Sequence, residues 1–567
     1  MICEISVSLP IVIVTIALGA QAPRPVPTFE CVGLYWRAEG GSDENTCSVR
    51  YRQAGSDGWR DAMPLWFDSR TMSPVGYSGR GETESRPWEH GGEYRGSIVH
   101  LEAGTRYEAE LRLSTGEKAT VVFETWREDF PAARRVEVSD STQTLVIREG
   151  GGRDGYVVYG PPADRASATI DVADGRPHCV EVRASYVIIR GLTLKGAQQH
   201  GIRIMNGCHD IVIEQCDISG WGRVLADGWG RNCDCAIYSS AGDLERVVVQ
   251  RNRIHHPRSD SNNWREERPA PGKREPSHPE GPQAVHFSNS AGNHVIRYNS
   301  VYSDEDHQYN DIFGAGSNFS VRGFPNCDSD IYGNYLSHCW DDTIESEGAN
   351  CNVRIWGNYS TDCYIAIASA GTSVGPLYVW RNVSGRMRVA DGDWGGGFFK
   401  TSDIMGGGRI YVFHNTILQP PVEKDGRSFS GGARVGIGWG GPVVNTISRN
   451  NIWNAREAPF WDKKADPSND YDYDLYRGAL PGGRTHQANG IAGEPTYDPA
   501  NGHGAFALAK GSPGYDAGLR IPNFNDNFTG AAPDMGAHEA ATPPMQFGVD
   551  AHLAGGGNRK PFAGKAL

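Results

Sequence analysis

The chain has 567 residues and a formal net charge of −13, so binding to the backbone of a nucleic acid is not expected. Its 72 glycines and 10% aromatic residues favour a turn-rich β protein over a disordered chain. The twelve cysteines suit an oxidising compartment and form no complete zinc-binding pattern.

Residues 1–22 are expected to be a secretory signal peptide. An apolar run from Leu9 to Ala20 is followed by the small-residue pattern Ala20–Ala22 of a cleavage site. The run is too short to span a bilayer, and no later apolar run reaches the length needed. We therefore expect a secreted protein, extracellular or periplasmic, with no membrane span and acting as a monomer.

Residues 30–127 are expected to form a separate β-sandwich. The segments "LYW" at Leu34–Trp36, "VRYR" at Val49–Arg52 and "LEAGTRYEAEL" at Leu101–Leu111 resemble a fibronectin type III domain. The resemblance implies that Tyr107 forms a tyrosine corner and that Trp36 is the core tryptophan. Such a module would support a catalytic domain.

Residues 133–460 contain an internal repeat of short β-branched strands separated by Gly, Asn or Asp turns. The shortest spacing is 24 residues, and no amphipathic helix lies between the strands. One position recurs at Leu192, Cys216, Asn252, Asn299, Asn334, Asn358, Asn382, Asn415 and Asn450. Seven asparagines at one position would stack and form hydrogen bonds along a solenoid axis.

This pattern resembles the right-handed parallel β-helix of the pectin-lyase-like superfamily. The resemblance implies an all-β fold, in which the sandwich precedes the solenoid and residues 461–567 form a loop-rich C-terminal cap. That superfamily contains lyases, hydrolases, epimerases and phage adhesins, so it does not by itself assign a function.

Four cysteines lie at matching positions of neighbouring repeats, Cys327 with Cys351 and Cys339 with Cys363. Stacked repeats would bring each pair close enough for a disulfide, and a ladder of buried thiols is the alternative.

The strands that precede the asparagine positions predict a groove. If Ile312 and Ile344 point inward with their equivalents, alternation places a varied set of side chains outward. This outward set is Arg203, Tyr238, His286, Asp311, Thr343, Glu345, Ala368, Lys400 and Arg434. A chemically varied surface of this kind is more typical of an active site than of an adhesin.

The segment "HCWDDTIESEG" at 338–348 places Asp341, Asp342, Glu345 and Glu347 within seven positions. Repeats stack about 4.8 Å apart, so Asp311 and Glu345 would hold their carboxyl groups roughly 5–6 Å apart, or Asp342 would form a wider pair. Paired carboxylates can divide acid and base roles in glycoside hydrolysis. Binding of Ca²⁺, with Asp341 and Glu347 as candidate ligands, or plain turn chemistry are the alternatives.

We therefore predict an enzyme that cleaves a polysaccharide, and favour hydrolysis without a required cofactor. The acidic side chains cluster on two central repeats, whereas Arg203, Lys400 and Arg434 lie toward the ends of the groove, where they would hold an acidic glycan. The catalytic candidates are Asp311, Asp342, Glu345, Lys400 and His286, and the substrate-binding candidates are Arg203, Tyr238, Trp264, Trp340 and Arg434. The rival is β-elimination with Lys400, Arg434 and Ca²⁺. The non-catalytic alternative is a glycan-binding surface protein.

Overall fold

The computed structural model describes residues 21–78, 82–87, 90–264, 278–314, 322–390, 394–401, 407–418, 433–440, 442–461, 466–480, 486–498 and 506–551. Residues 1–20, which hold most of the expected signal peptide, lie outside this set. Within the described residues no helix is long and apolar enough to cross a membrane.

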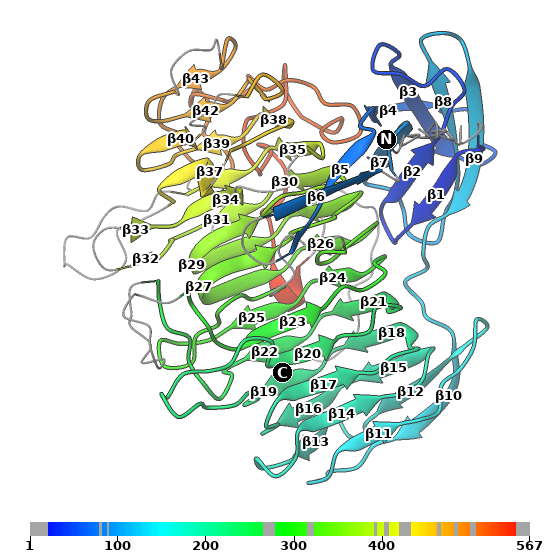
Figure 1. Cartoon of the computed structure of the whole chain (residues 1–567), viewed down its shortest axis with the longest axis vertical. Coiled ribbons are helices and arrows are strands. Elements are labelled where there is room, and N and C mark those ends of the chain that lie inside the picture. Colours follow the sequence, from blue (N-terminus) through cyan, green and yellow to red (C-terminus); the bar gives the residue numbers. More distant parts are fainter. Residues whose placement is uncertain are drawn as a thin grey trace, which may run out of the picture.

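The strands between residues 132 and 492 form a parallel β-helix, as the repeats predicted, and stack along the long axis of the molecule (Figure 1). Three parallel walls, called sheets A, B and C here, enclose it.

Sheet A has twelve strands: β10 (Ala132–Glu137), β12 (Tyr156–Gly160), β15 (Val187–Arg190), β18 (His209–Glu214), β21 (Glu245–Gln250), β24 (Val295–Arg297), β26 (Asp330–Tyr332), β28 (Val353–Trp356), β30 (Leu377–Trp380), β35 (Ile410–Phe413), β38 (Thr446–Arg449) and β41 (Asp470–Tyr471).

Sheet B begins with β11 (Leu145–Ile147), β14 (His178–Val182), β17 (His200–Ile204), β20 (Cys235–Ser239) and β23 (Gln283–Phe287). Phe313 bridges Val285 of β23 to Ile344 and so carries this wall onward. The wall continues through the C-terminal halves of β27 (Tyr335–Glu345) and β29 (Tyr359–Ala368), then β34 (Gly397–Thr401), β37 (Val435–Gly440) and β40 (Ala458–Trp461).

Sheet C contains β13 (Ala168–Asp171), β16 (Leu192–Lys195), β19 (Asp217–Ser219), β22 (Arg253–His255), β25 (Ser300–Tyr302), the N-terminal halves of β27 and β29, β31 (Val383–Ser384), β36 (Thr416–Ile417), β39 (Ile452–Trp453), β42 (Leu475–Tyr476) and β43 (Ile491–Ala492). A hairpin of β32 (Val389–Ala390) and β33 (Trp394–Gly395) and a 3-10 turn at Gly548–Asp550 complete the elements of the β-helix and C-terminal segment.

The predicted asparagine ladder is present and joins sheets A and C. Each side-chain amide donates to the side-chain oxygen of the next repeat, as from Asn252 Nδ2 to Asn299 Oδ1 at 3.0 Å. One member differs from the prediction: Asn451, and not Asn450, accepts from Asn415 at 2.9 Å. Asn450 has φ +59° and occupies the left-handed bend that precedes each ladder residue, where its amide donates to Leu519 O.

The N-terminal module is a seven-stranded antiparallel unit with a single core. Its strands are β1 (Arg24–Pro27), β2 (Val32–Trp36), β3 (Cys47–Gln53), β4 (Arg60–Asp68), β7 (Glu93–Ile98), β8 (Arg106–Leu113) and β9 (Lys118–Glu124), and a hairpin of β5 (Met72–Ser78) and β6 (Glu82–Pro87) extends from it. Trp36 is buried in this core. The Tyr107 hydroxyl accepts a hydrogen bond from Glu102 N–H at 2.9 Å, as in a tyrosine corner. Membership of the fibronectin type III family stays a prediction.

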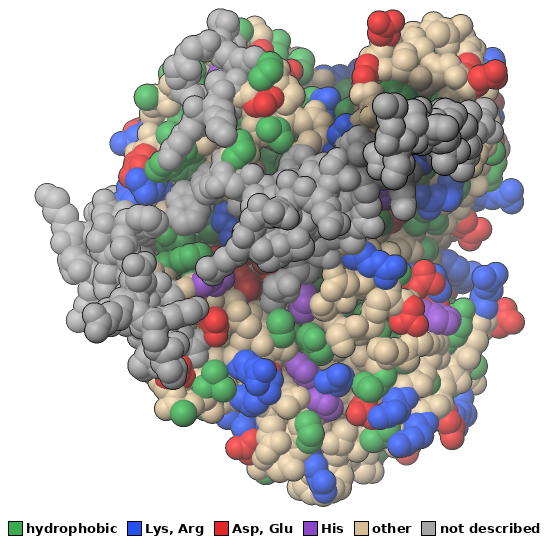
Figure 2. Space-filling model, in the orientation of Figure 1, with side chains coloured by type: hydrophobic (Ala, Val, Ile, Leu, Met, Phe, Trp, Pro, Cys, Tyr) green, Lys and Arg blue, Asp and Glu red, His purple; other side chains and the backbone are tan. Residues whose placement is uncertain are grey.

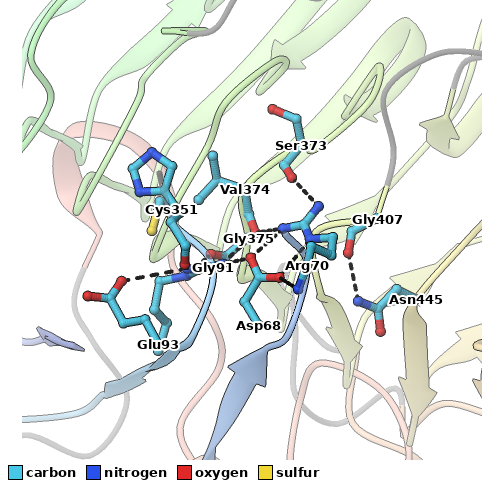
Figure 3. Close-up of polar contacts among 12 residues, drawn as sticks. Asp68, Arg70, Gly91, Glu93, Cys351, Ser373, Val374, Gly375, Gly407 and Asn445 are labelled. Carbon is cyan, nitrogen blue, oxygen red and sulfur yellow. Dashed lines mark hydrogen bonds and ion pairs between the residues drawn. The ribbon is translucent and has the colours of Figure 1, made fainter. Parts of the chain in front are cut away.

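The module is joined to the β-helix through buried charges (Figure 3). Arg95 donates to Asp68 at 2.5 Å and to the carbonyls of Val374 and Gly375 at 3.0 and 2.9 Å. Arg70 donates to Asp68 and to Ser373 O at 2.6 Å. Because these guanidinium groups donate hydrogen bonds to loop carbonyls of the β-helix, they hold the module against it.

All cysteines of the described residues are thiols. Cys339 and Cys363 are register partners on β27 and β29, and burial and their mutual contact raise the pKa of the Cys339 thiol. The structure therefore has the thiol ladder, one of the two arrangements that the sequence allowed.

Candidate active site

A bulge in β27 creates the acidic centre. The register between β27 and β29 shifts between Cys339 and Asp342, so that Asp342 pairs with Ile365. A bulge re-aims side chains at the place where a regular strand would alternate them. Here it turns both Asp341 and Asp342 toward the same buried space, and both are almost fully buried.

Asp311 reaches this centre from the preceding repeat. Its Oδ1 accepts the Asp342 N–H at 3.1 Å, and its Oδ2 accepts the Asn310 side-chain amide at 2.7 Å. The expected register was wrong by one residue, because Phe313 and not Ile312 bridges Val285 and Ile344. Asp311 therefore lies beside the Asp341–Asp342 bulge and not directly next to Glu345 on the sheet face.

Lys400 lies at the centre of the acidic residues. Its Nζ is 2.5 Å from Asp342 Oδ2 and 3.6 Å from Asp341 Oδ1. The sequence placed this lysine two repeats away, toward the end of the groove. Strand register confirms the two repeats, since Glu345 pairs with Ala368 and Ala368 with Lys400. The methyl group of Ala368 leaves the space across which the long lysine side chain extends.

The pKa values of this centre are strongly displaced. Burial, aided by the Asp341 charge, raises the pKa of Asp311 to about 8. Burial likewise raises the pKa of Asp342 and Glu345 well above the usual range. The pKa of Asp341 shifts in the opposite direction: burial would raise it, but the Lys400 charge lowers it below the usual value. Burial alone would lower the pKa of Lys400, but the surrounding carboxylates raise it well above its usual value.

The carboxylate oxygens fit a hard cation. Single oxygens of Asp311, Asp341 and Asp342 lie within 4.8 Å of one another, and so do those of Asp342, Glu345 and Glu347. One buried oxygen each of Asp341, Asp342, Glu345 and Glu347 has no hydrogen-bond partner among the described residues. Buried anionic oxygens without donors are costly, and Ca²⁺ prefers oxygen ligands of this type. The predicted ligands Asp341 and Glu347 thus belong to two different triads, which share the predicted catalytic residue Asp342.

His278 was not among the predicted site residues. Its Nε2 lies 3.0 Å from Asp341 Oδ2, and its Nδ1 lies 2.7 Å from Pro279 O. Burial acts against protonation, but the Asp341 charge raises the pKa of His278 to about 9. The residue lies at the end of a long polar insertion. Because the insertion is not part of the repeat, its sequence does not indicate which of its side chains contacts the acidic residues.

The predicted residue His286 lies apart from the centre. Burial alone lowers its pKa to about 3, so no carboxylate is close enough to counter it. Its ring packs 5.8 Å from Phe324 and 6.0 Å from Tyr238. Arg203 lies over Tyr238, with its guanidinium carbon 5.8 Å from the ring centre. These residues form a polar and aromatic stretch of sheet B that precedes the acidic centre.

Of the two predicted tryptophans, Trp340 is buried and Trp264 is partly buried. Trp340 is 6% exposed and clusters with Tyr364 and Ala368, while the Arg388 guanidinium lies 4.6 Å from its ring. Trp264 lies 6.2 Å from Tyr364. They form the wall beside the acidic centre, and the exposure of Trp340 is too small for a sugar-stacking platform.

The predicted binding residue Arg434 has internal partners. Its Nε donates to Glu457 at 2.6 Å, and its guanidinium lies 4.9 Å from the Trp461 ring.

On the visible face of the molecule, acidic and basic side chains are interspersed (Figure 2). The charge of the described site is therefore concentrated in the buried centre.

No protein-family model and no curated protein matches the chain. Among solved structures it is similar to pectate lyase Pel9A, with a TM-score of 0.33 and 11% identity over 72% of this chain and 86% of that chain. It is also similar to the catalytic unit of the thermostable GH87 alpha-1,3-glucanase from Streptomyces thermodiastaticus strain HF3-3, with a TM-score of 0.30 and 13% identity over 83% and 84%. Both scores are low, and the parallel ladders described above establish the β-helix.

Proposed function

We propose that this protein is a polysaccharide lyase that cleaves a uronate-containing glycan by β-elimination, with Lys400 as the base. The observation that carries the proposal is the position of Lys400 Nζ, 2.5 Å from Asp342, among carboxylate oxygens that lack donors. Elimination needs a base and a neutraliser of the substrate carboxylate at one place, and Lys400 beside carboxylates that could hold a cation supports this reaction.

The residues of the centre have distinct roles in this reaction. Asp311, Asp341, Asp342, Glu345 and Glu347 would hold a divalent cation. When bound, the cation would neutralise the substrate carboxylate and offset the field of the carboxylates on Lys400. In that state the Lys400 ammonium would first lose its proton to solvent, and the neutral Nζ would then accept the proton from the sugar carbon next to the carboxylate. The electron pair of that C–H bond forms the C=C bond, the glycosidic C–O bond breaks, and the departing oxygen takes a proton from water.

Hydrolysis is the second candidate, and one observation favours it. The pKa of Asp311 is raised to about 8 while that of Asp341 is lowered, so near neutral pH one is an acid and the other a carboxylate base. Single oxygens of the two carboxyl groups lie within 4.8 Å, which is closer to the ~5–5.5 Å of a retaining pair than to the ~6.5–9.5 Å of an inverting pair. The position of Lys400 weighs against hydrolysis, because it removes the reason for which the sequence favoured it, namely basic residues only toward the ends of the groove.

The test is a panel of uronate-containing and neutral glycans, each incubated with CaCl₂ or with EDTA. Elimination yields new reducing ends together with the ultraviolet absorbance of a conjugated double bond. Reducing ends without that absorbance would replace the lyase proposal by hydrolysis. Retention of a glycan with neither product would indicate a binding protein. Export and a monomeric state stay predictions from the sequence.

A further inference from the structure

A large cavity that does not include the acidic centre lies where three parts of the chain meet. Its volume is about 1350 Å³, above the ~300–1,000 Å³ of many ligand pockets. The N-terminal module contributes Trp59 and His100, the β-helix contributes Trp356 and Arg381, and the C-terminal segment contributes His538 and Gln546. The β-helix residues follow or end strands of sheet A, whereas the acidic centre lies on sheet B.

The cavity wall follows from the bends of the β-helix. Tyr298, Gly333, Gly357 and Arg381 occupy the left-handed bend that precedes each ladder asparagine, with φ between 51° and 65°. The same four residues line the cavity. Arg381 is the cation of this row.

Arg381 differs from the other charged groups of the cavity. Of the acids that line the cavity, Asp129 pairs with Arg127 at 2.7 Å, Asp526 with Arg520 at 2.9 Å and Glu128 with Arg297 at 3.0 Å. Glu30, Asp61 and Glu102 line it as well. Glu539 accepts two backbone N–H groups at 3.0 Å each.

For Arg381, in contrast, the one hydrogen bond within the described chain runs from Nη1 to Ala537 O at 2.8 Å, and no described carboxylate lies within ion-pair distance. Burial lowers the pKa of Arg381, although Glu539 and Asp534 act in the opposite direction.

Two histidines near this guanidinium are neutral. Burial, together with the Arg381 charge, lowers the pKa of His100 to about 4. The pKa of His538 is also lowered by burial, and its Nδ1 has no hydrogen-bond partner among the described residues. Trp356 Nε1, likewise buried, has none either. The cavity thus combines a cation that has no ion-pair partner within the described chain, although Glu539 and Asp534 act on it at longer range, with polar atoms that lack partners and with aromatic walls.

We propose that this cavity binds a carboxylate-bearing sugar, with Arg381 as the partner of the carboxylate. Guanidinium binds a carboxylate in a planar, two-bond geometry that a hydroxyl group cannot match. That the anion is a uronate rests on the proposed function, whereas the anion site itself rests on Arg381 and the cavity alone. The cavity is then a second sugar site, separate from the acidic centre.

Calorimetric titration of the full chain with D-galacturonate and D-glucuronate tests this, with D-galactose and D-glucose as neutral controls. The titrations use the wild-type protein in EDTA, so that cation-dependent binding at the acidic centre does not contribute, and the free monosaccharides have no glycosidic bond to be cleaved. We expect a uronate to bind and the neutral sugars to bind at least about tenfold more weakly, because a charge-assisted pair is lost. No uronate binding at millimolar concentration would overturn the proposal.

Two variants in the same background locate the site. Arg381→Gln should weaken uronate binding at least about tenfold. Gln546→Trp adds bulk at an exposed wall residue of the cavity and should also weaken binding, without touching the Arg381–Ala537 bond. Unchanged affinity in both variants would refute the site. If the enzyme assays fail but both variants lose uronate binding, the cavity proposal stands and the proposed lyase activity falls.

Discussion

Replacement of Lys400 by methionine tests the proposed base most directly. Methionine has a similar length and fits a packed site, but it can neither accept a proton nor pair with a carboxylate. Loss of a positioned base typically costs about 10²–10⁴ in turnover, or roughly 2.7–5.5 kcal/mol in the activation barrier. Lys195→Met, an exposed lysine on β16, is the matched control and should retain normal turnover.

The same substitution has a second effect that can be measured separately. Removal of Lys400 leaves Asp342, which is 1% exposed, without its ion-pair partner at 2.5 Å. Breaking a buried pair in this way costs about 3–5 kcal/mol in the free energy of unfolding. Added CaCl₂ should restore much of this stability, because a cation compensates the same carboxylates, but it should not restore turnover.

The assay pairs urea unfolding, with EDTA or with CaCl₂, with the rise of ultraviolet absorbance on a uronate glycan. A folded Lys400→Met protein that keeps more than a tenth of the wild-type turnover would refute Lys400 as the base. Loss of activity that returns in full with CaCl₂ would show that Lys400 acts only in stability.

Three further predictions concern the cation, the module interface and pH. CaCl₂ at a hundredfold excess over Kd should stabilise the wild type by about 2.7 kcal/mol and raise its unfolding temperature. Asp342→Asn should abolish this rise, whereas Asp140→Asn, at an exposed residue, should keep it. Arg95→Met leaves buried Asp68 with Arg70 alone and should cost about 3–5 kcal/mol in urea unfolding, against less than about 1 kcal/mol for Arg50→Met at the surface. Burial lowers the pKa of His286 to about 3, so below the unfolded value of about 6.5 the unfolded chain binds a proton that the folded chain does not. The free energy of unfolding should therefore decrease as the pH is lowered, by about 2 kcal/mol at pH 5 for this group. His286→Phe should remove this part of the pH dependence and leave turnover largely unchanged. An unaltered pH dependence of stability would contradict the assignment.

The fold was predictable because a solenoid repeats one local rule. Short β-branched strands, turn residues and an asparagine at a fixed position recur many times. If one repeat is misread, the others still indicate the same fold. The mistaken ladder position at Asn450 shows the limit: two adjacent asparagines satisfy the same pattern, and only the bend geometry assigns Asn451 to the ladder.

The sequence alone also determined that Asp311, Asp342, Glu345 and Lys400 share one wall of the β-helix, because a period of two and a repeat length place them there. Tertiary structure decided how they meet. The bulge after Cys339 and the Phe313 bridge shift the register by one residue, which no alternation reveals. The reach of Lys400 across Ala368, and the return of His278 to Asp341 from an insertion, depend on packing between segments far apart in the chain. Strand periodicity is a local property, whereas the charge balance of a buried site is the sum of contacts that only the folded chain brings together.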